Sequence, residues 1–539
     1  MTGGEILIAC LKAQGVRCLF GMPGTQNIGL YEAVRRQDVI RSVLIRNEQA
    51  ATLMADGYAR AGGDVGVALT VPGPGASNAS TGLGEAYTDR SPVLLITGGV
   101  DTRFEGRDRG KMFHGLDQAT FFKPITKYYA CPQTVADIPE AVAGAFRAMR
   151  AYRPGPAVLE FPPDVVSAEG EASIPPRVEA LSPSPSEADL RAALRALQAA
   201  ARPVILAGGG ILAAGASADL VRLAEALNAP VVTTRLGKGA IPEDHPLFLG
   251  HIRGRSGQQV VAQADATLAV GCRFTQIDTS GWTMQIPKPL IQIDADPEEI
   301  GKEYPADVGV AGDLRQALSQ LTERLDPGVP RPGWASALSP IREGARNRPP
   351  LLVMDVLRQV LPRDAVVSVD VTTVGYRAFD EFPIYEPRTF LYPCHYVNLG
   401  YAFPAALGAK LARPDRAVVS VSGDGGFLMT AYELMTAVQY RIPVVAVVIN
   451  DNCLSAIKGI QDKTYDGHAI DVEMQNPDYV RFAEAFGCRG LRASTPEALG
   501  SAVREAVQAD GPTLIEVPLS PDQRDALIRR IPWIHPENQ

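Results

Sequence analysis

Short apolar runs alternate with amphipathic segments along most of the chain. In the first part, the runs at 18–20, 42–45, 67–70, 93–96 and 157–160 consist mainly of small, aliphatic and β-branched residues. Such runs are typical of strands that are buried on both faces of a parallel sheet. Between them, apolar residues recur at helical spacing, as in 6–13. The alternation predicts a parallel α/β domain over residues 1–170.

The same alternation returns twice, each time after a Pro-rich stretch that indicates a linker. The first linker (162–187) precedes apolar runs at 204–206, 231–233, 266–270 and 290–293, and the second (326–350) precedes a third α/β region. A chain of 539 residues is too long for one hydrophobic core. We therefore predict fold class α/β, with three doubly wound domains of mainly parallel strands at 1–170, 188–325 and 351–520, and a polar tail at 521–539 that either packs over a site or forms a surface strap.

The strongest candidate chemistry lies in a strand–turn–helix–strand pattern of the third domain. A strand at 417–421 enters the turn Gly423-Asp424-Gly425-Gly426, a helix is predicted at 427–440, and a second strand at 444–449 ends at Asn450-Asp451-Asn452. Both strands of a β-α-β crossover point the same way, so Asp424 and Asp451 are expected at one carboxyl edge. Open α/β sheets bind ligands at that edge.

The residue types at this edge suggest a ligand. Backbone N–H groups of a glycine turn at a helix N-terminus suit phosphate, and carboxylates beside phosphate oxygens suit Mg²⁺. These features predict a magnesium–diphosphate site. The alternative is an ordinary Rossmann-type crossover with turn glycines.

The amino-acid sequence of this segment also resembles that of a known family. Gly-Asp-Gly, followed 27 residues after Asp424 by Asp451, is similar to the signature of thiamine diphosphate (ThDP, or thiamine pyrophosphate) enzymes. The stretch GDGGFLMTAYELMTAVQY is most similar to the acetolactate synthase-like branch. The resemblance covers essentially the whole chain and implies a pyrimidine-binding (PYR) domain at 1–170, a central domain, and a diphosphate-binding (PP) domain at 351–520.

The resemblance implies roles for residues of the PP domain. Asp424, Asp451 and the carbonyl of Cys453 would hold Mg²⁺; Asp451 replaces the commoner Asn and keeps an oxygen donor. Leu399 would support the bent cofactor, and Leu454 would begin a helix at the substrate pocket; alternatively Leu399 is an ordinary core residue. Hydroxyls of two threonines could bond phosphate oxygens, unless they only form a turn. The remaining cofactor-binding residues complete the set: Thr372, Thr373, Gly423, Gly425, Gly426 and Asn450.

In the PYR domain the main candidate is Glu48, which precedes a predicted helix. A carboxylate there is stabilised by the helix dipole, so a structural cap is one interpretation. However, RNEQAATLMADGYAR resembles the family segment that bears a catalytic glutamate. The resemblance implies that Glu48 bonds the cofactor's aminopyrimidine and promotes the proton transfer that activates it, with a pKa raised by burial.

Three further features of the PYR domain gain roles only from the resemblance. The turns with Gly24 and with Pro72-Gly73 would flank the aminopyrimidine. Phe113-His114 would line the substrate pocket, where His114 can transfer a proton near neutral pH; the alternative is a surface or core histidine. Lys123 could pair with a substrate carboxylate.

Glycine turns of the central domain, at 208–210 and 271, are weak signals. Relatives use this domain for FAD, for ADP or CoA, or for no ligand, and the sequence does not choose among them.

Bulk composition excludes several classes of protein. The net charge of −8 offers no footprint for nucleic acid or an anionic membrane surface. Seven cysteines without a CxxC motif favour reduced thiols over disulfides or a zinc site. The chain starts without the regions of a signal peptide, and no apolar run reaches the roughly 18–20 residues of a membrane span. We expect a cytoplasmic protein that acts on small molecules.

Together these features predict a ThDP- and Mg²⁺-dependent enzyme that forms or cleaves a C–C bond of a 2-oxo acid. An acetolactate synthase-like carboligase is the leading interpretation. Alternatives are a 2-oxo acid decarboxylase, a 2-hydroxyacyl-CoA lyase and an FAD-dependent 2-oxo acid oxidase. The resemblance also implies a homodimer or homotetramer whose active site lies at the subunit interface.

Overall fold

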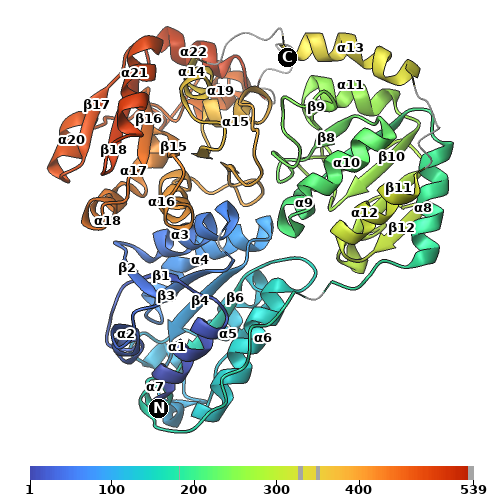
Figure 1. Cartoon of the computed structure of the whole chain (residues 1–539). Coiled ribbons are helices and arrows are strands. Elements are labelled where there is room, and N and C mark those ends of the chain that lie inside the picture. Colours follow the sequence, from blue (N-terminus) through green and yellow to red (C-terminus); the bar gives the residue numbers. More distant parts are fainter. Residues whose placement is uncertain (63, 181, 326–331, 347–351, 532–533, 535–539) are drawn as a thin grey trace. The chain divides into compact units, whose positions relative to one another are not determined.

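The computed structural model describes residues 1–62, 64–180, 182–325, 332–346, 352–531 and 534 (Figure 1). Its described strands form three six-stranded sheets, one within each predicted domain. The strand pairs with a defined register are all parallel, which confirms the predicted fold class. The chain forms two compact units: one holds Met1–Leu181, Ala365–Gly375 and Leu391–Ile534, and the described part of the other holds Ser182–Asp364 and Tyr376–Phe390. The domain boundaries taken from the sequence remain predictions.

The first sheet, in the PYR domain, has the strand order β2-β1-β3-β4-β6-β5. The predicted strands are confirmed, but β5 was missed because it has only three half-buried residues, two of them tyrosines. The strands are β1 (Cys18–Gly21), β2 (Arg41–Leu44), β3 (Gly66–Thr70), β4 (Val93–Gly98), β5 (Tyr128–Ala130) and β6 (Ala157–Phe161). The helices are α1 (Gly3–Ala13), α2 (Ile28–Arg35), α3 (Glu48–Ala61), α4 (Pro74–Asp89), α5 (Gln118–Phe122), α6 (Ile138–Arg150) and α7 (Pro163–Ser167), with the short 3₁₀ turns η1 (Thr102–Phe104), η2 (Arg109–Lys111), η3 (Lys123–Ile125) and η4 (Val135–Asp137).

The central sheet has the order β12-β11-β10-β7-β8-β9. Its strands are β7 (Pro203–Ala207), β8 (Val231–Thr233), β9 (Phe248–His251), β10 (Ala266–Val270), β11 (Leu290–Asp294) and β12 (Val308–Ala311). Its helices are α8 (Glu187–Ala199), α9 (Gly209–Ala214), α10 (Ser217–Leu227), α11 (Arg255–Gln263), α12 (Leu314–Arg324) and α13 (Pro332–Arg346), with η5 (Pro297–Glu299).

The third sheet, in the PP domain, has the order β14-β13-β15-β16-β18-β17. Its strands are β13 (Val366–Val369), β14 (Phe390–Leu391), β15 (Val418–Gly423), β16 (Val445–Asn450), β17 (Arg489–Arg492) and β18 (Thr513–Pro518). Its helices are α14 (Leu352–Val360), α15 (Thr373–Glu381), α16 (Ala402–Ala412), α17 (Asp424–Leu428), α18 (Leu434–Gln439), α19 (Ser455–Thr464), α20 (Tyr479–Ala485), α21 (Pro496–Ala506) and α22 (Pro521–Ile528), with η6 (Ala431–Glu433).

Two predictions of local structure were wrong. The helix expected at 427–440 is divided into α17, η6 and α18, because Thr430 leaves helical geometry and its hydroxyl donates to the carbonyl oxygen of Gly400 at 3.0 Å. The linker expected at 326–350 contains α13, whose Trp334 is buried against the central domain. Residues 326–331 and 347–350 of that linker lie outside the described residues.

The C-terminal tail begins as a capped helix. Ser520 and Gln523 form a capping box at the start of α22. A Cβ added to Gly459 of α19 would lie 3.3 Å from the Cδ1 atom of Ile534 and closer still to Ile528, so the tail packs on α19. Residues 532–533 and 535–539 of the predicted tail lie outside the described residues.

The PYR and PP domains share one hydrophobic core within their unit. Helices α3 and α16 approach so closely that a Cβ at Gly57 would overlap the backbone of Ala405, and a Cβ at Gly408 would overlap that of Met54. Only glycine allows this backbone approach. In the part of the chain that the structure describes, no helix is long and apolar enough to cross a membrane. The seven cysteines are free.

A buried carboxyl group joins the two domains beside Glu48. Glu433 of η6 accepts hydrogen bonds from the backbone N–H groups of Arg46 at 2.8 Å and Asn47 at 3.2 Å. Its other oxygen accepts from the hydroxyl of Thr436 at 2.6 Å, and this hydroxyl also donates to the carbonyl oxygen of Leu44 at 3.1 Å. The PP domain therefore fixes the backbone that follows β2. Glu48, the first residue of α3, comes directly after this backbone.

Because it is buried, Glu433 has a pKa raised from 4.5 to about 7, although the Thr436 hydroxyl and the two N–H groups oppose the shift. A folded-state pKa above the unfolded one means that stability is highest below the unfolded pKa and is lost as the pH rises through the folded pKa. For wild type we expect this loss to reach about 3 kcal/mol between pH 4.5 and 7. In E433Q the amide oxygen can still accept hydrogen bonds from both N–H groups. The amide does not titrate, so the pH-dependent loss of stability that we assign to the Glu433 carboxyl should disappear.

The measurement is the urea-unfolding midpoint of wild type and E433Q from pH 5 to 8. E484Q, which changes an exposed glutamate, is the matched control. A constant difference between wild type and E433Q at every pH would contradict the assignment.

Candidate active site

The carboxyl edge of the PP sheet gathers donors around one buried carboxylate. Asp424, which follows β15, accepts hydrogen bonds from the backbone N–H groups of Gly425 at 2.8 Å, Asn452 at 2.7 Å and Asp451 at 3.2 Å. The amide of Asn476 donates to the same carboxylate at 2.7 Å and to the Asn450 side-chain oxygen at 2.9 Å. The ends of β15 and β16 therefore converge, as the crossover predicts.

Asp451 lies beside Asp424 and orders the chain that follows. Its carboxylate accepts from the backbone N–H of Cys453 at 3.1 Å and from the hydroxyl of Ser455, the first residue of α19, at 2.6 Å. Burial raises the pKa of Asp451 to about 6, and the charge of Asp424 adds to the rise; burial also raises the pKa of Asp424. Two buried carboxylates side by side, one of which raises the pKa of the other, favour a cation between them.

The donor set fits Mg²⁺ with a diphosphate. Among the described residues, no three His, Cys, Asp or Glu side chains converge as a protein-only metal site. Mg²⁺ in proteins commonly takes one or two carboxylates and completes its octahedron with phosphate oxygens and water. Asp424, Asp451 and the Cys453 carbonyl are the groups at this edge that would hold it.

Other predicted cofactor residues lie against the same turn. Thr372 borders Gly423: a Cβ added to Gly423 would lie 3.2 Å from its hydroxyl oxygen. A Cβ at Gly425 would lie 3.0 Å from a methyl group of Leu454, and one at Gly426 would lie 3.1 Å from the Asp370 carboxylate. Thr373 is buried as the first residue of α15. The glycines thus leave space that side chains would fill.

Asp370 positions the loop that carries Leu399. Its carboxylate accepts from the Gly400 backbone N–H at 3.1 and 3.2 Å, and burial raises its pKa to about 6. Leu399 itself is more than one-third exposed, so it is not an ordinary core leucine. The neighbouring Asn398 is buried, and its side-chain oxygen and nitrogen have no hydrogen-bond partner among the described residues. A polar ligand at this edge would satisfy such atoms.

The second half of the candidate site is at the carboxyl edge of the PYR sheet. Glu48 is the first residue of α3, and the Asn47 side chain caps that helix by accepting from the Gln49 N–H at 2.9 Å. The buried Glu48 carboxylate accepts from the Asn78 amide at 3.1 Å. A Cβ at Gly75 would lie 3.0 Å from its other oxygen. Glu48 is therefore not the helix cap; Asn47 has that role.

The loop after β3 connects Glu48 to His114. Gly73 has φ +62°, and a Cβ on it would lie 2.8 Å from the carbonyl oxygen of His114. Only glycine combines this conformation with such an approach. The His114 ring stacks on Phe113 with centroids 4.1 Å apart, and its buried Nδ1 atom has no partner among the described residues. Phe113 is 71% exposed.

The remaining predicted residues of the PYR domain make fewer contacts with Glu48 and His114. Gly24 lies against Val71, in the loop that contains Pro72, so the two predicted turns meet. Lys123, in η3, is exposed, and within the described ranges no contact joins it to His114. Nor does any hydrogen bond or ion pair between described residues join Glu48 to Asp424.

Four positioning residues were missed from the sequence: Asn78, Asp370, Glu433 and Asn476. Glu433 belongs to the quoted motif, but it binds the backbone just after strand β2, in the other domain. Asn476 lies in an irregular segment 52 residues after Asp424. Neither spacing nor periodicity signals such contacts.

In the central domain, the glycines of two loops pack on each other. A Cβ on Gly208 would overlap Gly271, and one on Gly210 would lie 2.6 Å from the Gly271 Cα. This packing explains the glycines without a nucleotide, so the choice between FAD, ADP or CoA and no ligand stays open.

Comparisons with known proteins agree with this arrangement. Three family models match: "Thiamine pyrophosphate enzyme, N-terminal TPP binding domain" over residues 1–121, "central domain" over 190–321 and "C-terminal TPP binding domain" over 370–517.

Relatives match over nearly the whole chain. A Methanocaldococcus jannaschii protein named probable acetolactate synthase large subunit is 34% identical over 97% of this chain and 92% of its own. The Escherichia coli acetolactate synthase isozyme 3 large subunit is 35% identical over 94% and 92%. A Pseudomonas aeruginosa protein named probable 2-ketoarginine decarboxylase AruI is 36% identical over 96% and 94%. The chain thus belongs to the thiamine pyrophosphate enzymes, in their acetolactate synthase-like branch.

Proposed function

We propose that this enzyme uses ThDP and Mg²⁺ to join the two-carbon fragment of a decarboxylated 2-oxo acid to a carbonyl acceptor. The observation that carries the proposal is the convergence of Asp424, Asp451 and the glycine turn at one sheet edge. The relatives named acetolactate synthase support carboligation. When bound, ThDP supplies a nucleophilic carbon and an electron sink for the carbanion that decarboxylation leaves.

The residues of this chain divide the remaining work. Asp424, Asp451 and the Cys453 carbonyl hold Mg²⁺, while Gly423, Gly425 and Gly426 leave the backbone free to approach the diphosphate. Thr372, Thr373 and Asn450 complete that region, and Leu399 supports the cofactor from the loop that Asp370 fixes. Glu48 would exchange a proton with the aminopyrimidine of the cofactor, and Asn78 donates a hydrogen bond that orients the Glu48 carboxylate.

The substrate side is formed by the exposed segments. Gly24 and Pro72-Gly73 line the approach to the reacting carbon, and Phe113 and Leu454 offer apolar surface to the acyl group. His114 can transfer a proton to or from the reacting oxygen, and Lys123 can pair with the substrate carboxylate.

A homodimer would complete this site. Glu48 and Asp424 belong to one compact unit, yet no contact between described residues joins them. Exposed apolar side chains occur in the predicted cofactor and substrate segments, among them Phe113, Leu399, Ile457 and Ile460. Exposed apolar groups of this kind mark ligand or protein interfaces. We propose that Glu48 of one chain meets Asp424 of a second.

A 2-oxo acid decarboxylase is the second candidate. The relative named 2-ketoarginine decarboxylase is as similar to this chain as those named acetolactate synthase. The two activities share every step up to the carbanion and differ only in whether a proton or a carbonyl compound captures it. The residues described here serve both.

A panel of 2-oxo acids, with and without aldehyde or ketone acceptors, decides between them. Carboligation predicts carbon dioxide plus a 2-hydroxy-ketone product identified by mass, whereas decarboxylation predicts the free aldehyde. E48Q should lower either rate about a hundredfold or more, because general acid–base catalysis contributes about 10²–10⁴. E140Q, at an exposed site, is the matched control. Wild-type rates in E48Q, or oxygen consumption by a yellow protein, would contradict the proposal.

The metal assignment is tested by binding alone. In wild type, ThDP with Mg²⁺ should raise the melting temperature, because a ligand that binds only the folded state stabilises it. D424A should lose most of this shift, while D466N, an exposed neighbour of α19, should keep it. An undiminished shift in D424A would show that the diphosphate site lies elsewhere.

A further inference from the structure

A cavity of about 150 Å³ lies at the other end of the PYR sheet edge, between the ends of β4, β5 and β6. Glu48 follows β2, and β4 is three strand spacings away, or about 14 Å. A cavity of this size accommodates a molecule about as large as benzene. None of the residues assigned above to catalysis, cofactor or metal lines it.

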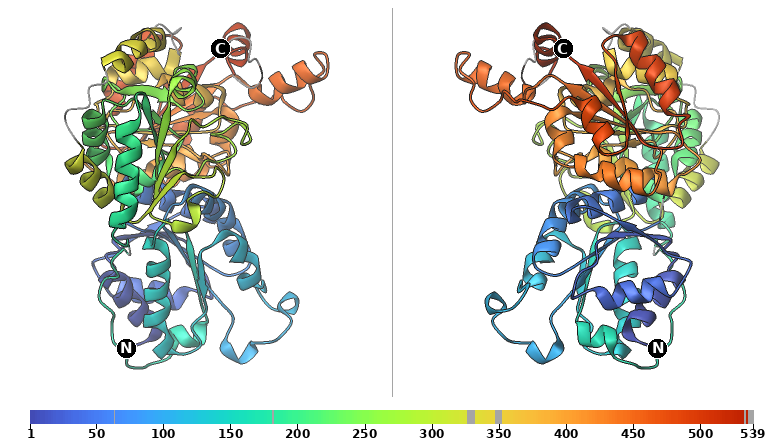
Figure 2. Two further views of the ribbon diagram at one scale, coloured as in Figure 1. Left: turned by 90° about the vertical axis from the view of Figure 1, so that its right-hand side faces the viewer. Right: turned by 90° about the vertical axis from the view of Figure 1, so that its left-hand side faces the viewer.

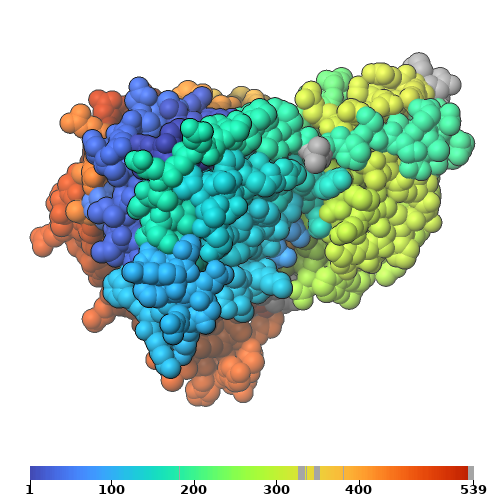
Figure 3. Space-filling model, turned by 90° about the horizontal axis from the view of Figure 1, so that it is seen from below, coloured from blue at the N-terminus to red at the C-terminus, as the bar shows by residue number. Residues whose placement is uncertain are grey.

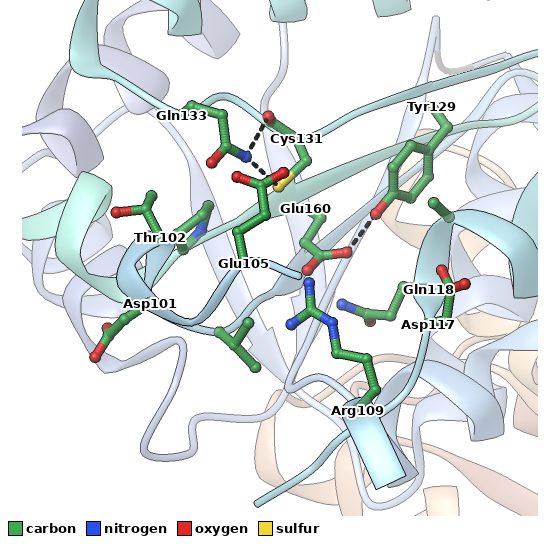
Figure 4. A pocket seen from close by; sticks show the side chains of 13 residues that line it. Asp101, Thr102, Glu105, Arg109, Asp117, Gln118, Tyr129, Cys131, Gln133 and Glu160 are labelled. Atoms are coloured by element: carbon green, nitrogen blue, oxygen red, sulfur yellow. Dashed lines mark hydrogen bonds between the residues drawn. The ribbon is translucent and has the colours of Figure 1, made fainter. Parts of the chain in front are cut away.

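The floor of the cavity is a buried carboxyl group. Glu160, at the end of β6, is 4% exposed and accepts a hydrogen bond from the Tyr129 hydroxyl. Burial raises its pKa, while Tyr129 and the nearby Arg109 oppose the rise. Asp101, Glu105 and Asp117 also line the cavity (Figure 4), and Glu105 and Asp117 are exposed to solvent.

The lining has one cation, Arg109 of η2, and its guanidinium points into the cavity toward Glu160 (Figure 4). It makes no hydrogen bond or ion pair with any residue that the structure describes. Its planar donors are suited to bidentate binding of a carboxylate. The Glu105 carboxylate likewise has no hydrogen-bond or ion-pair partner among the described residues, whereas Asp117 caps α5 through Thr120.

The cavity is not equipped for covalent chemistry. Its thiol, Cys131, has a pKa raised to about 12 by burial and by the Glu160 charge. A thiol of this kind is not a thiolate at neutral pH and is a poor nucleophile. Gln133 instead donates to the Cys131 sulfur at 3.3 Å and to its carbonyl oxygen at 3.1 Å.

We propose that this cavity binds a small zwitterion, a molecule with one carboxylate and one ammonium or guanidinium group. The carboxylate pairs with Arg109, and the cationic group lies against Glu160 and Glu105. A purely anionic ligand would meet the carboxylates, and a purely cationic one would leave the Arg109 guanidinium without a partner, so the zwitterion is favoured over both. Neither ThDP nor the 2-oxo acid takes part in this binding.

Occupation of the cavity would act on the catalytic half-site through one loop. The segment 99–117 contributes Asp101, Glu105 and Arg109 to the cavity and also carries Phe113 and His114. It projects from the PYR domain as a light-blue extension (Figures 2 and 3). A ligand held between Arg109 and Glu160 ties this loop to β6. Since the His114 backbone rests on Gly73, the ligand also restrains the substrate side of the site.

Matched probes test the charge pattern on the ThDP–Mg²⁺ form of the full chain. The panel contains the common amino acids, 4-aminobutyrate and 4-guanidinobutyrate, with butyrate and butylamine as single-charge controls. Isothermal titration calorimetry should show at least one zwitterion binding with a Kd below 10 mM (about −3 kcal/mol), and each single-charge control about tenfold weaker or more.

R109Q should weaken zwitterion binding at least about tenfold, because a charge-assisted pair is lost. R107Q removes an exposed arginine two residues earlier that does not line the cavity, so its affinity should be unchanged. E105Q should weaken binding, with E140Q as its control. The proposal is overturned if no zwitterion binds, if butyrate or butylamine binds equally well, or if R109Q binds like wild type.

Discussion

The two halves of the candidate site are mechanically linked within one chain by the buried carboxyl group of Glu433. It lies on η6, the element that follows α17, which begins with Asp424, and it holds the backbone just before Glu48. If either domain moved alone, the Glu433 carboxyl group and the backbone N–H groups that it binds would be left buried without hydrogen-bond partners. Such a loss costs folding free energy. If the site forms across a dimer, Glu433 connects the metal end of one site to the glutamate of the other.

Much of this arrangement follows from the sequence. Uniformly apolar runs predicted parallel strands, and the common direction of parallel strands predicted that Asp424 and Asp451 would meet. Short or half-polar strands such as β5 carry no such signal. The helix expected at 427–440 fails because Thr430 bonds to Gly400 of another loop, a tertiary contact that local periodicity cannot contain.

Side-chain partners were harder to predict than the edge itself. Glu48 was found through its resemblance to a family segment, but the amide that orients it, Asn78, lies on another helix. Asn476 donates a hydrogen bond to Asp424, and Asp370 accepts one from Gly400 in the loop that carries Leu399. Both partners are distant in the sequence. The cavity beside Glu160 also depends on three separate strand ends, so its mixture of charges becomes visible only in three dimensions.

The central claim, that Glu48 and Asp424 of different chains form one site, is tested most directly by mixing two inactive variants. E48Q and D424A are unfolded together, refolded as a one-to-one mixture and assayed with ThDP, Mg²⁺ and the preferred 2-oxo acid. Half of the dimers should then be mixed, each with one intact site, so we expect about a quarter of wild-type activity. Activity no higher than that of either variant alone would contradict a site shared between chains.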